Sequence, residues 1–345
     1  GGRSWCHYVC PFGIVQMIFT GPRGLLGSNA LAANPGSITQ SMCRSVDEKT
    51  SQEVSACIGC KSACIDIDAE KSYWENLRKP GRKLVQYGYL GLVIGYFVYY
   101  YLYAGNFDYY FSGAWTHEEN QLATLWKPGF YILGRAIDIP KIVAVPLTFI
   151  LSVTITYCIC TKIEKYYRAS LKGKGKSIGS DVILHRTFST CTFLAFNCFF
   201  IYGGRPELLR LPIVLQLLFN AAVVLVSALW LIRNWNYSEK KYKKDSLAHS
   251  FRRQLEKLPV DLSSLLNQRS LDELTSDELF ILASVIPKLR EKERQQIYKS
   301  IFKDGLVNDT FTSADSFAAL KQIRSSLDLK EEEHYTILSQ IISEN

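Results

Sequence analysis

The sequence predicts an all-α integral membrane protein with about four transmembrane helices, a cysteine-rich head before them and a soluble all-helical domain after them. Several apolar runs lie between residues 84 and 235, and each has the length of about 20 residues that crosses a bilayer as a helix. Cysteines cluster ahead of these runs, and charged residues with helical periodicity follow them. We therefore expect three parts: residues 1–76, 77–235 and 236–345.

The cysteines of residues 57–64 have the spacing of an iron–sulfur loop. Cys57, Cys60 and Cys64 follow a C-x2-C-x3-C pattern, and Val54 stands where a ferredoxin run would place its first cysteine. A [4Fe–4S] cluster needs four soft anionic ligands. One ligand must therefore come from elsewhere in the chain.

A second cysteine pair, Cys6 and Cys10, is the nearest source of that ligand. Cys10 is followed by Pro11, as the remote ligand of a ferredoxin cluster often is, so we rank it before Cys6 and before the isolated Cys43. The sequence thus predicts an irregular iron–sulfur head with one [4Fe–4S] cluster. Its metal and cofactor ligands are four of the following five residues: Cys6, Cys10, Cys57, Cys60 and Cys64.

Other uses of these cysteines remain as alternatives. Two clusters would need eight thiolates, and only six cysteines lie outside the apolar runs. A tetrahedral zinc site would use the same atoms, but zinc favours paired knuckles over a C-x3-C-P spacing. A disulfide set fits less well, and we expect the four cysteines inside the apolar runs to be small packing residues: Cys158, Cys160, Cys191 and Cys198.

The first cysteine pair also carries a family resemblance. Residues 2–13, GRSWCHYVCPFG, resemble the G-R-x-W-C-x-x-x-C-P-x-G signature of membrane-bound polyferredoxins of the NapH and NosR type, and residues 57–60 resemble the ferredoxin motif of such proteins. This resemblance covers about the first fifth of the chain. It implies membrane helices with a cytoplasmic iron–sulfur head that transfers electrons between the quinone pool and a redox partner. In that family spans precede the signature, and since this sequence begins at Gly1 without a methionine, we expect an upstream membrane part to be missing from it.

Two stretches of the head lack a clear element. Residues 12–19 are apolar but too short to cross a bilayer, so we expect them to lie at the interface or against the cluster. Residues 21–56 are rich in Gly, Ser, Asn and Ala, which favours a loop or an irregular cover.

Four spans are predicted, at about residues 84–103, 142–161, 182–202 and 211–230. Lys and Arg concentrate before the first span, between the second and third, and after the fourth. Because positive residues stay on the cytoplasmic side, both ends of this chain should lie on the cytoplasmic or stromal side of a bacterial inner membrane or a thylakoid-type membrane.

The loops between the spans offer weaker candidates. We expect residues 106–138 to form a long, partly structured loop at the membrane surface, with His117 as an exposed surface histidine beside Glu118 and Glu119. His185 and Arg186 begin the third span, where interface anchoring is the favoured role and contact with an anionic lipid or a quinone head group is the alternative.

The C-terminal part has the sequence pattern of amphipathic helices. Thr275 to Glu278 forms a helix start, Pro287 ends that helix, and three further segments with apolar residues at helical spacing follow at about residues 290–302, 313–327 and 329–342.

These observations favour a membrane-anchored electron-transfer protein that relays electrons between a redox partner and the membrane or quinone pool. The alternative is an accessory, assembly or redox-sensing subunit of a larger membrane complex with a structural cluster, and a transporter fits less well because the spans contain almost no charge. The net charge is +8, but the positive residues lie beside the apolar runs and do not form a continuous basic face with interleaved aromatic residues. Nucleic acid is therefore not an expected partner. We expect membrane lipids, a quinone and a redox partner or larger membrane complex as partners. The sequence contains no nucleophile–base set and no nucleotide-binding motif, so it predicts no catalytic residues. Whether the protein is a component of an oxidoreductase is left open.

Overall fold

In a computed structural model of the protein, helices account for most of the residues whose structure is described. These are residues 15, 18–19, 44–46, 51–55, 69–117, 121–173, 178–256, 271–275, 278–279, 281–282, 291–307, 311 and 314–343. The chain divides into a helical bundle, which includes residues 72–237, and a second unit that includes residues 238–345. The predicted mostly helical fold is confirmed over the described residues.

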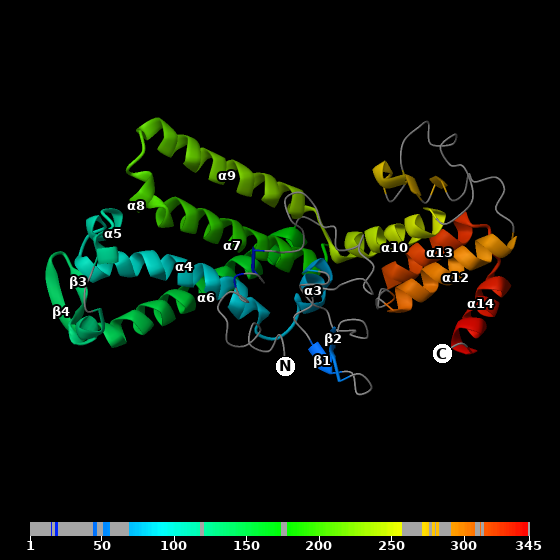
Figure 1. Ribbon diagram of the computed structural model, residues 1–345, viewed down its shortest axis with the longest axis horizontal. Coiled ribbons are helices and arrows are strands. Elements are labelled where there is room, and N and C mark those ends of the chain that lie inside the picture. Colours follow the sequence, from blue (N-terminus) through cyan, green and yellow to red (C-terminus); the bar gives the residue numbers. More distant parts are fainter. Residues whose placement is uncertain are drawn as a thin grey trace. The chain divides into compact units, whose positions relative to one another are not determined.

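The bundle contains the four helices expected from the apolar runs (Figure 1). α4 packs against α6 and α7, and α7 packs against α9, while the short α3 precedes α4 in the chain. By length and composition, α6 and α9 could cross a membrane, so two of the four predicted spans are supported on those grounds. The bounds are α3 Ala69–Asn76, α4 Arg82–Ala104, α6 Lys141–Gly173, α7 Ser180–Gly203 and α9 Ile213–Trp235.

Small residues let α4 approach α6 closely. Gly91 and Gly95 of α4 form a G-x3-G pair, and they face Ser152 and Thr156 of α6. A Cβ at Gly91 would lie 2.7 Å from the Ser152 carbonyl oxygen, and one at Gly95 would lie 2.8 Å from the Ser152 Oγ. Close packing of small residues is typical of helix pairs in lipid, where no hydrophobic effect drives the helices together.

α9 turns its asparagine and serine side chains inward and most of its apolar side chains outward. Ser227 and Asn234 are buried, and with the partly buried Asn220 they recur every seven residues along one stripe of the helix. Asn197 of α7 donates a hydrogen bond to Ser227 Oγ over 2.9 Å. Exposed apolar residues cover the rest of α9: Ile213, Val214, Leu215, Leu217, Leu218, Phe219, Val224, Leu225, Val226, Leu229 and Ile232.

The connection between α4 and α6 is more ordered than the predicted loop. α4 ends at Gly105, whose positive φ of 75° places its N–H on the Tyr101 carbonyl. Short helical turns and an antiparallel hairpin then lead directly into α6. They are α5 Asp108–Phe111, η2 Ala114–His117, η3 Gln121–Trp126, β3 Pro128–Ile132 and β4 Arg135–Pro140.

Part of the predicted irregular cover at residues 21–56 forms regular structure. β1 Arg44–Val46 pairs with β2 Glu53–Ser55 as an antiparallel hairpin. An irregular conformation is therefore wrong for these six residues, because main-chain pairing can form without the alternating apolar pattern that would announce a half-buried strand.

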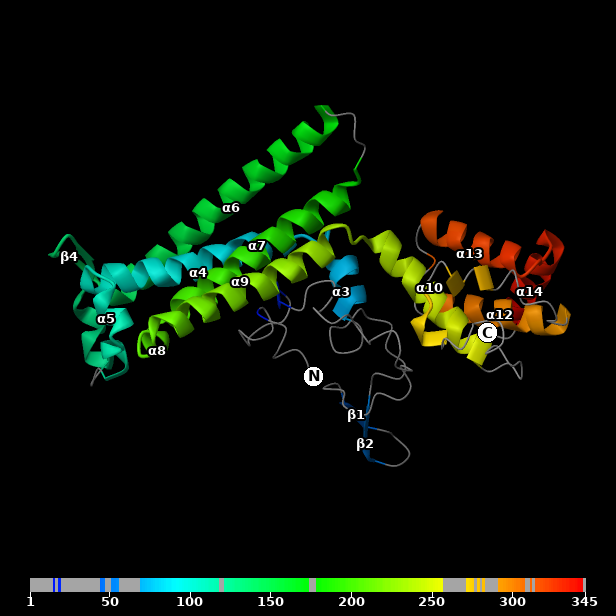
Figure 2. The same cartoon turned by 90° about the horizontal axis from the view of Figure 1, so that it is seen from above.

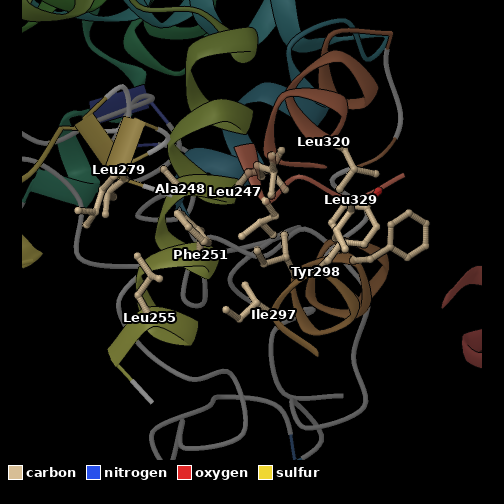
Figure 3. Close-up of a cluster of buried hydrophobic side chains, with 14 of the residues drawn as sticks. Leu247, Ala248, Phe251, Leu255, Leu279, Ile297, Tyr298, Leu320 and Leu329 are labelled. Atoms are coloured by element: carbon tan, nitrogen blue, oxygen red, sulfur yellow. The ribbon is translucent and has the colours of Figure 1, made fainter. Parts of the chain in front are cut away.

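The C-terminal unit is a helical domain around one apolar core (Figure 3). Phe251 and Leu255 of α10 meet Ile297 and Tyr298 of α12 in this core, and Leu320 from α13 also contributes to it. The three predicted later helices are confirmed, whereas α10 falls where the sequence indicated only a basic segment. Their bounds are α10 Glu239–Glu256, α12 Glu291–Val307, α13 Ala314–Ser326 and α14 Glu331–Ser343, and η4 Leu271–Glu273 lies between α10 and α12.

The predicted helix start at Thr275 is also confirmed. The Thr275 backbone N–H donates to Glu278 Oε2 over 2.8 Å, and the Glu278 N–H donates to Thr275 Oγ1 over 3.3 Å. This reciprocal pair is a capping box, which satisfies N–H groups that have no partner within the helix.

Substituting Gly91→Val should destabilise the bundle, because the added side chain would overlap the α6 backbone. Overpacking of this kind costs about 1–3 kcal/mol. We expect a lower unfolding temperature in a solubilising detergent. Leu92→Val is the matched control, since Leu92 is exposed on the next position of the same helix. Equal unfolding temperatures for the two variants would contradict close packing at Gly91.

His334 should make the helical domain less stable as the pH falls. Its Nδ1 lies 2.9 Å from the Tyr298 hydroxyl, and burial, followed by the Arg324 charge, lowers its pKa below the usual 6.5 while Glu331 opposes this. The unfolded chain therefore takes up the proton first, so the stabilisation is present above about pH 7 and is lost as the pH falls through the folded-state pKa.

Amide-exchange protection factors of α12 and α14 at about pH 8 and about pH 5 would measure this loss. His334→Gln removes the titrating group and should remove most of the difference. A His334→Gln variant with the same pH dependence as the original chain would assign the effect to other groups.

Candidate functional site

The predicted cluster ligands lie outside the described residues. This holds for Cys6, Cys10, Cys57, Cys60 and Cys64, and for the alternative ligand Cys43. Among the described residues, no group of three or more His, Cys, Asp or Glu side chains could hold a metal ion. The iron–sulfur site therefore stays a prediction, and the described residues define how the chain next to each cysteine motif is attached to the bundle.

The chain after the first motif is attached at Ile18 and Phe19. Ile18 is buried, and its carbonyl accepts a hydrogen bond from Thr192 Oγ1 of α7 over 3.5 Å. The Phe19 ring makes edge contacts with Tyr89 of α4 and Phe196 of α7. The end of the predicted interfacial or cluster-packed segment 12–19 thus lies against two bundle helices.

The chain after the second motif is attached through α3. Tyr73, Trp74 and Leu77 are buried, and the Tyr73 hydroxyl lies 2.9 Å from Nδ1 of His185 in α7. The Trp74 ring centroid is 5.0 Å from that of His185. Burial, partly opposed by Arg82, raises the pKa of Tyr73 above its ordinary value, so its hydroxyl remains a donor.

His185 is the centre of a buried hydrogen-bonded group at this end of the bundle. Its side chain has no exposed surface, and its Nε2 lies 2.7 Å from the Asn234 carbonyl oxygen at the end of α9. A carbonyl can only accept, so Nε2 carries the proton and Nδ1 accepts from Tyr73. The predicted interface-anchoring role of His185, and its alternative contact with a lipid or quinone, is wrong for the imidazole, because both ring nitrogens are engaged inside the protein.

Its neighbour Arg186 is held at the helix end in a similar way. The guanidinium donates to the Trp235 carbonyl over 3.0 Å, to the Tyr167 hydroxyl over 2.9 Å and to Asn236 Oδ1 over 3.1 Å. Arg186 therefore joins the start of α7 to the ends of α6 and α9.

A second buried polar group surrounds Glu164 of α6, which is only 3% exposed. Lys83 Nζ and Arg168 Nη2 each lie 2.9 Å from its carboxylate, and the Tyr87 hydroxyl donates to Oε2 over 3.0 Å. A buried carboxylate with two cations and a hydroxyl has its charge and lone pairs satisfied. Because Lys83 and Tyr87 belong to α4, this group joins α4 to α6.

Several polar atoms of the same bundle end remain without a partner in the described part of the chain. They are the Trp74 indole Nε1, Gln86 Oε1, Ser189 Oγ and Asn234 Oδ1, all buried. Gln86 is otherwise fixed through its Nε2, which donates to Thr192 Oγ1 over 2.7 Å. Buried groups of this kind are usually satisfied by internal water.

Two of the predicted packing cysteines face each other. The sulfur atoms of Cys160 in α6 and Cys191 in α7 are 3.7 Å apart, and both residues are buried as free thiols. Cys158 is exposed and Cys198 is partly buried. The sequence did not pair them, because hydropathy does not indicate which faces of two spans meet.

His117 lies exposed in η2, as predicted for a surface histidine. Its neighbours Glu118 and Glu119 fall outside the described residues.

The comparisons with known proteins add no relative. The chain matches no family model, no curated protein and no solved structure.

Removing His185 should unfold this end of the bundle more easily. His185→Phe leaves the Tyr73 hydroxyl unpaired and removes one of the hydrogen bonds that the Asn234 carbonyl accepts, and a buried unpaired group costs about 1–3 kcal/mol. Tyr73→Phe should also destabilise, and the double variant should lose less than the sum of the two, because the same interaction is lost only once.

Unfolding temperatures in one detergent would measure this coupling. Tyr166→Phe, at a side chain that is mostly exposed, is the control and should have little effect. Strict additivity of the two substitutions would show that Tyr73 and His185 stabilise the bundle independently.

Proposed function

We propose that this protein is a membrane-anchored electron-transfer protein with one [4Fe–4S] cluster on the cytoplasmic or stromal side. The observation that carries the proposal is the cysteine pattern, in which Cys57-x2-Cys60-x3-Cys64 lacks one ferredoxin ligand and Cys6-x3-Cys10-Pro11 can supply it. When bound, such a cluster supplies one-electron chemistry between a redox partner and the membrane or quinone pool.

The outward-facing apolar side chains of the bundle support a membrane anchor. Soluble monomers rarely expose apolar patches larger than a few hundred Å². Here exposed aliphatic residues run along α6, and α9 keeps Asn234 and Ser227 inside while leucines and isoleucines point outward. Such a distribution suits a hydrocarbon surrounding, in which polar groups must find partners within the protein.

α4 and α7 would complete four spans in this arrangement. They extend over 23 and 24 residues, which is long enough for a hydrocarbon core of about 30 Å. The G-x3-G packing of α4 and the inter-helix bond between Asn197 and Ser227 are the kinds of contact that hold helices together in lipid.

The two attachment points are compatible with a shared cluster. Cys10 lies eight residues before Ile18, and Cys64 lies five residues before Ala69 at the start of α3, so the two tethers reach at most about 28 Å and about 17 Å. The segments in which they end contact α7 at Thr192 and at His185, which are separated by about 10 Å along the helix. Ligands from the two motifs can therefore reach a common cluster.

Charge at the same bundle end supports a cytoplasmic or stromal position for the head. Arg78 forms an ion pair with Asp181, and Lys83 and Arg168 form ion pairs with Glu164. Positive residues retained next to apolar helices mark the cytoplasmic side of a membrane protein.

Replacing a cluster ligand should abolish the low-temperature EPR signal of the reduced protein. We expect this loss for Cys57→Ser, Cys60→Ser and Cys64→Ser, because a serine hydroxyl is a poor substitute for thiolate at iron. The iron and sulfide contents of the anaerobically purified variants should fall in parallel.

Cys158→Ser is the matched control, since this exposed cysteine of α6 belongs to neither motif, and it should keep the signal. Cys10→Ser should lower the iron content more than Cys43→Ser. An unchanged signal in all three ligand variants would exclude the cluster assignment. If neither a quinol analogue nor soluble electron donors reduce the cluster, the accessory-subunit alternative is favoured.

A further inference from the structure

The hairpin of β3 and β4 packs against the end of α4 through Tyr131 and carries exposed isoleucines on its other face. Phe130 pairs with Ile137, and Ile132 with Arg135, so these residues share a face, while Tyr131 and Ala136 lie on the other. Tyr131 lies against Gly105 at the end of α4. Ile132 and Ile137, on the opposite face, are exposed.

The tip of the hairpin carries an exposed leucine in an unfavourable conformation. Leu133 has φ 51° and Gly134 has φ 77°, which are the values of a type I′ turn. Asn or Gly normally occupies the first of these positions, and a leucine there costs about 1 kcal/mol or more. Leu133 is nevertheless 87% exposed, so no contact within the described structure compensates this cost.

The hairpin is fixed at the start of α6. The Lys141 N–H donates to the Lys127 carbonyl over 3.1 Å, and a Cβ at Gly129 would lie 2.9 Å from Lys141 Cα. β4 leads into α6 without a linker (Figure 2). Ile142 and Val143, in the first turn of α6, are exposed and apolar. The exposed apolar surface of α6 therefore continues onto the hairpin.

Exposed residues of η3 extend the same end of the bundle. Trp126 is 74% exposed and Leu122 is 82% exposed, and Trp126 directly precedes the residue whose carbonyl binds Lys141. Trp is enriched where a membrane helix leaves the hydrocarbon, and the exposed Lys127 and Arg135 suit the head-group layer.

We propose that the outward face of the β3–β4 hairpin, with Leu133 at its tip and Trp126 beside it, inserts into the interfacial layer of the lipid bilayer. This rests on the membrane anchoring contained in the proposed function. We favour the lipid over a protein partner because the exposed apolar surface of the hairpin continues that of α6. Since no linker separates β4 from α6, the hairpin must stay close to the membrane in which α6 lies. Insertion provides the apolar contact that Leu133 lacks in the described chain.

Added tryptophans can test the insertion in vesicles with brominated acyl chains. Leu133→Trp reports on the hairpin tip, and Leu225→Trp reports on the exposed middle of α9, each as the emission gained over the original chain. We expect Leu133→Trp to be quenched most by bromine near the head-group end of the chains and Leu225→Trp by bromine near the methyl end. Leu306→Trp, in the C-terminal domain, is the control and should lose no emission.

The outcomes separate this inference from the proposed function. Quenching of Leu225→Trp without quenching of Leu133→Trp would overturn the insertion and leave the membrane anchor standing. No quenching of either would overturn the anchor itself. Strongest quenching of Leu133→Trp from the methyl end would also contradict an interfacial position.

A second variant measures the role of Leu133 without disturbing the turn. Asn tolerates the left-handed conformation, so Leu133→Asn should keep or raise the unfolding temperature in detergent. In vesicles the same variant should reduce the quenching of Trp126, measured as the difference from a matched Trp126→Phe variant. A lower unfolding temperature, or unchanged Trp126 quenching, would contradict insertion through Leu133.

Discussion

Both ring nitrogens of His185 are hydrogen bonded inside the protein, and the arrangement of the bundle end depends on this. One nitrogen holds Tyr73 of α3 and the other holds the last turn of α9, so a single side chain of α7 joins three segments that are far apart in sequence. α3 begins five residues after the last cysteine of the second motif. His185 therefore helps to fix the position of α3 against α7 and α9.

The bundle pairs several buried polar groups across its helices while it exposes aliphatic side chains. Glu164 has two cations and a tyrosine hydroxyl around it, and Asn197 is bound to Ser227 across the interface between α7 and α9. The bonds of Glu164 to Lys83 and Tyr87, and that of Asn197 to Ser227, connect different helices. They therefore specify which faces meet, whereas contacts between aliphatic residues would tolerate several packings. Polar contacts thus give this bundle its specificity.

Hydropathy predicted the four bundle helices because apolar runs of span length leave few other structures, but it could not place their ends. α6 continues to Gly173, beyond the predicted end near residue 161, because Glu164 and Arg168 are satisfied by one another and by Lys83. The hairpin at residues 128–140 was missed because Leu133-Gly134 is an unusual turn pair. α10 lies in the predicted helical domain but was not predicted as a helix of its own, because its lysines were interpreted only as the basic segment after the fourth span.

Of the candidate site, the cysteine motifs could be predicted from the sequence, whereas the buried polar groups around His185 and Glu164 could not. Ligand spacing is a local property, so the cysteine motifs could be predicted, although their residues lie outside the described structure. The partners of His185 and Glu164 depend on helix packing, which spacing along one chain does not encode. The heptad recurrence of Asn220, Ser227 and Asn234 was the one signal in the sequence that could have indicated an inward polar stripe.

The two faces of α9 place different demands on sequence change over evolutionary time. Outward positions such as Leu217 and Leu225 need only remain apolar, so many exchanges among aliphatic residues are neutral there. Ser227 must stay small and must keep a hydroxyl for Asn197. Substitutions among Leu, Ile and Val should therefore be tolerated along most of α9. At the inward positions Asn220, Ser227 and Asn234 we expect fewer substitutions, and a change at Ser227 should require a compensating change at Asn197 of α7.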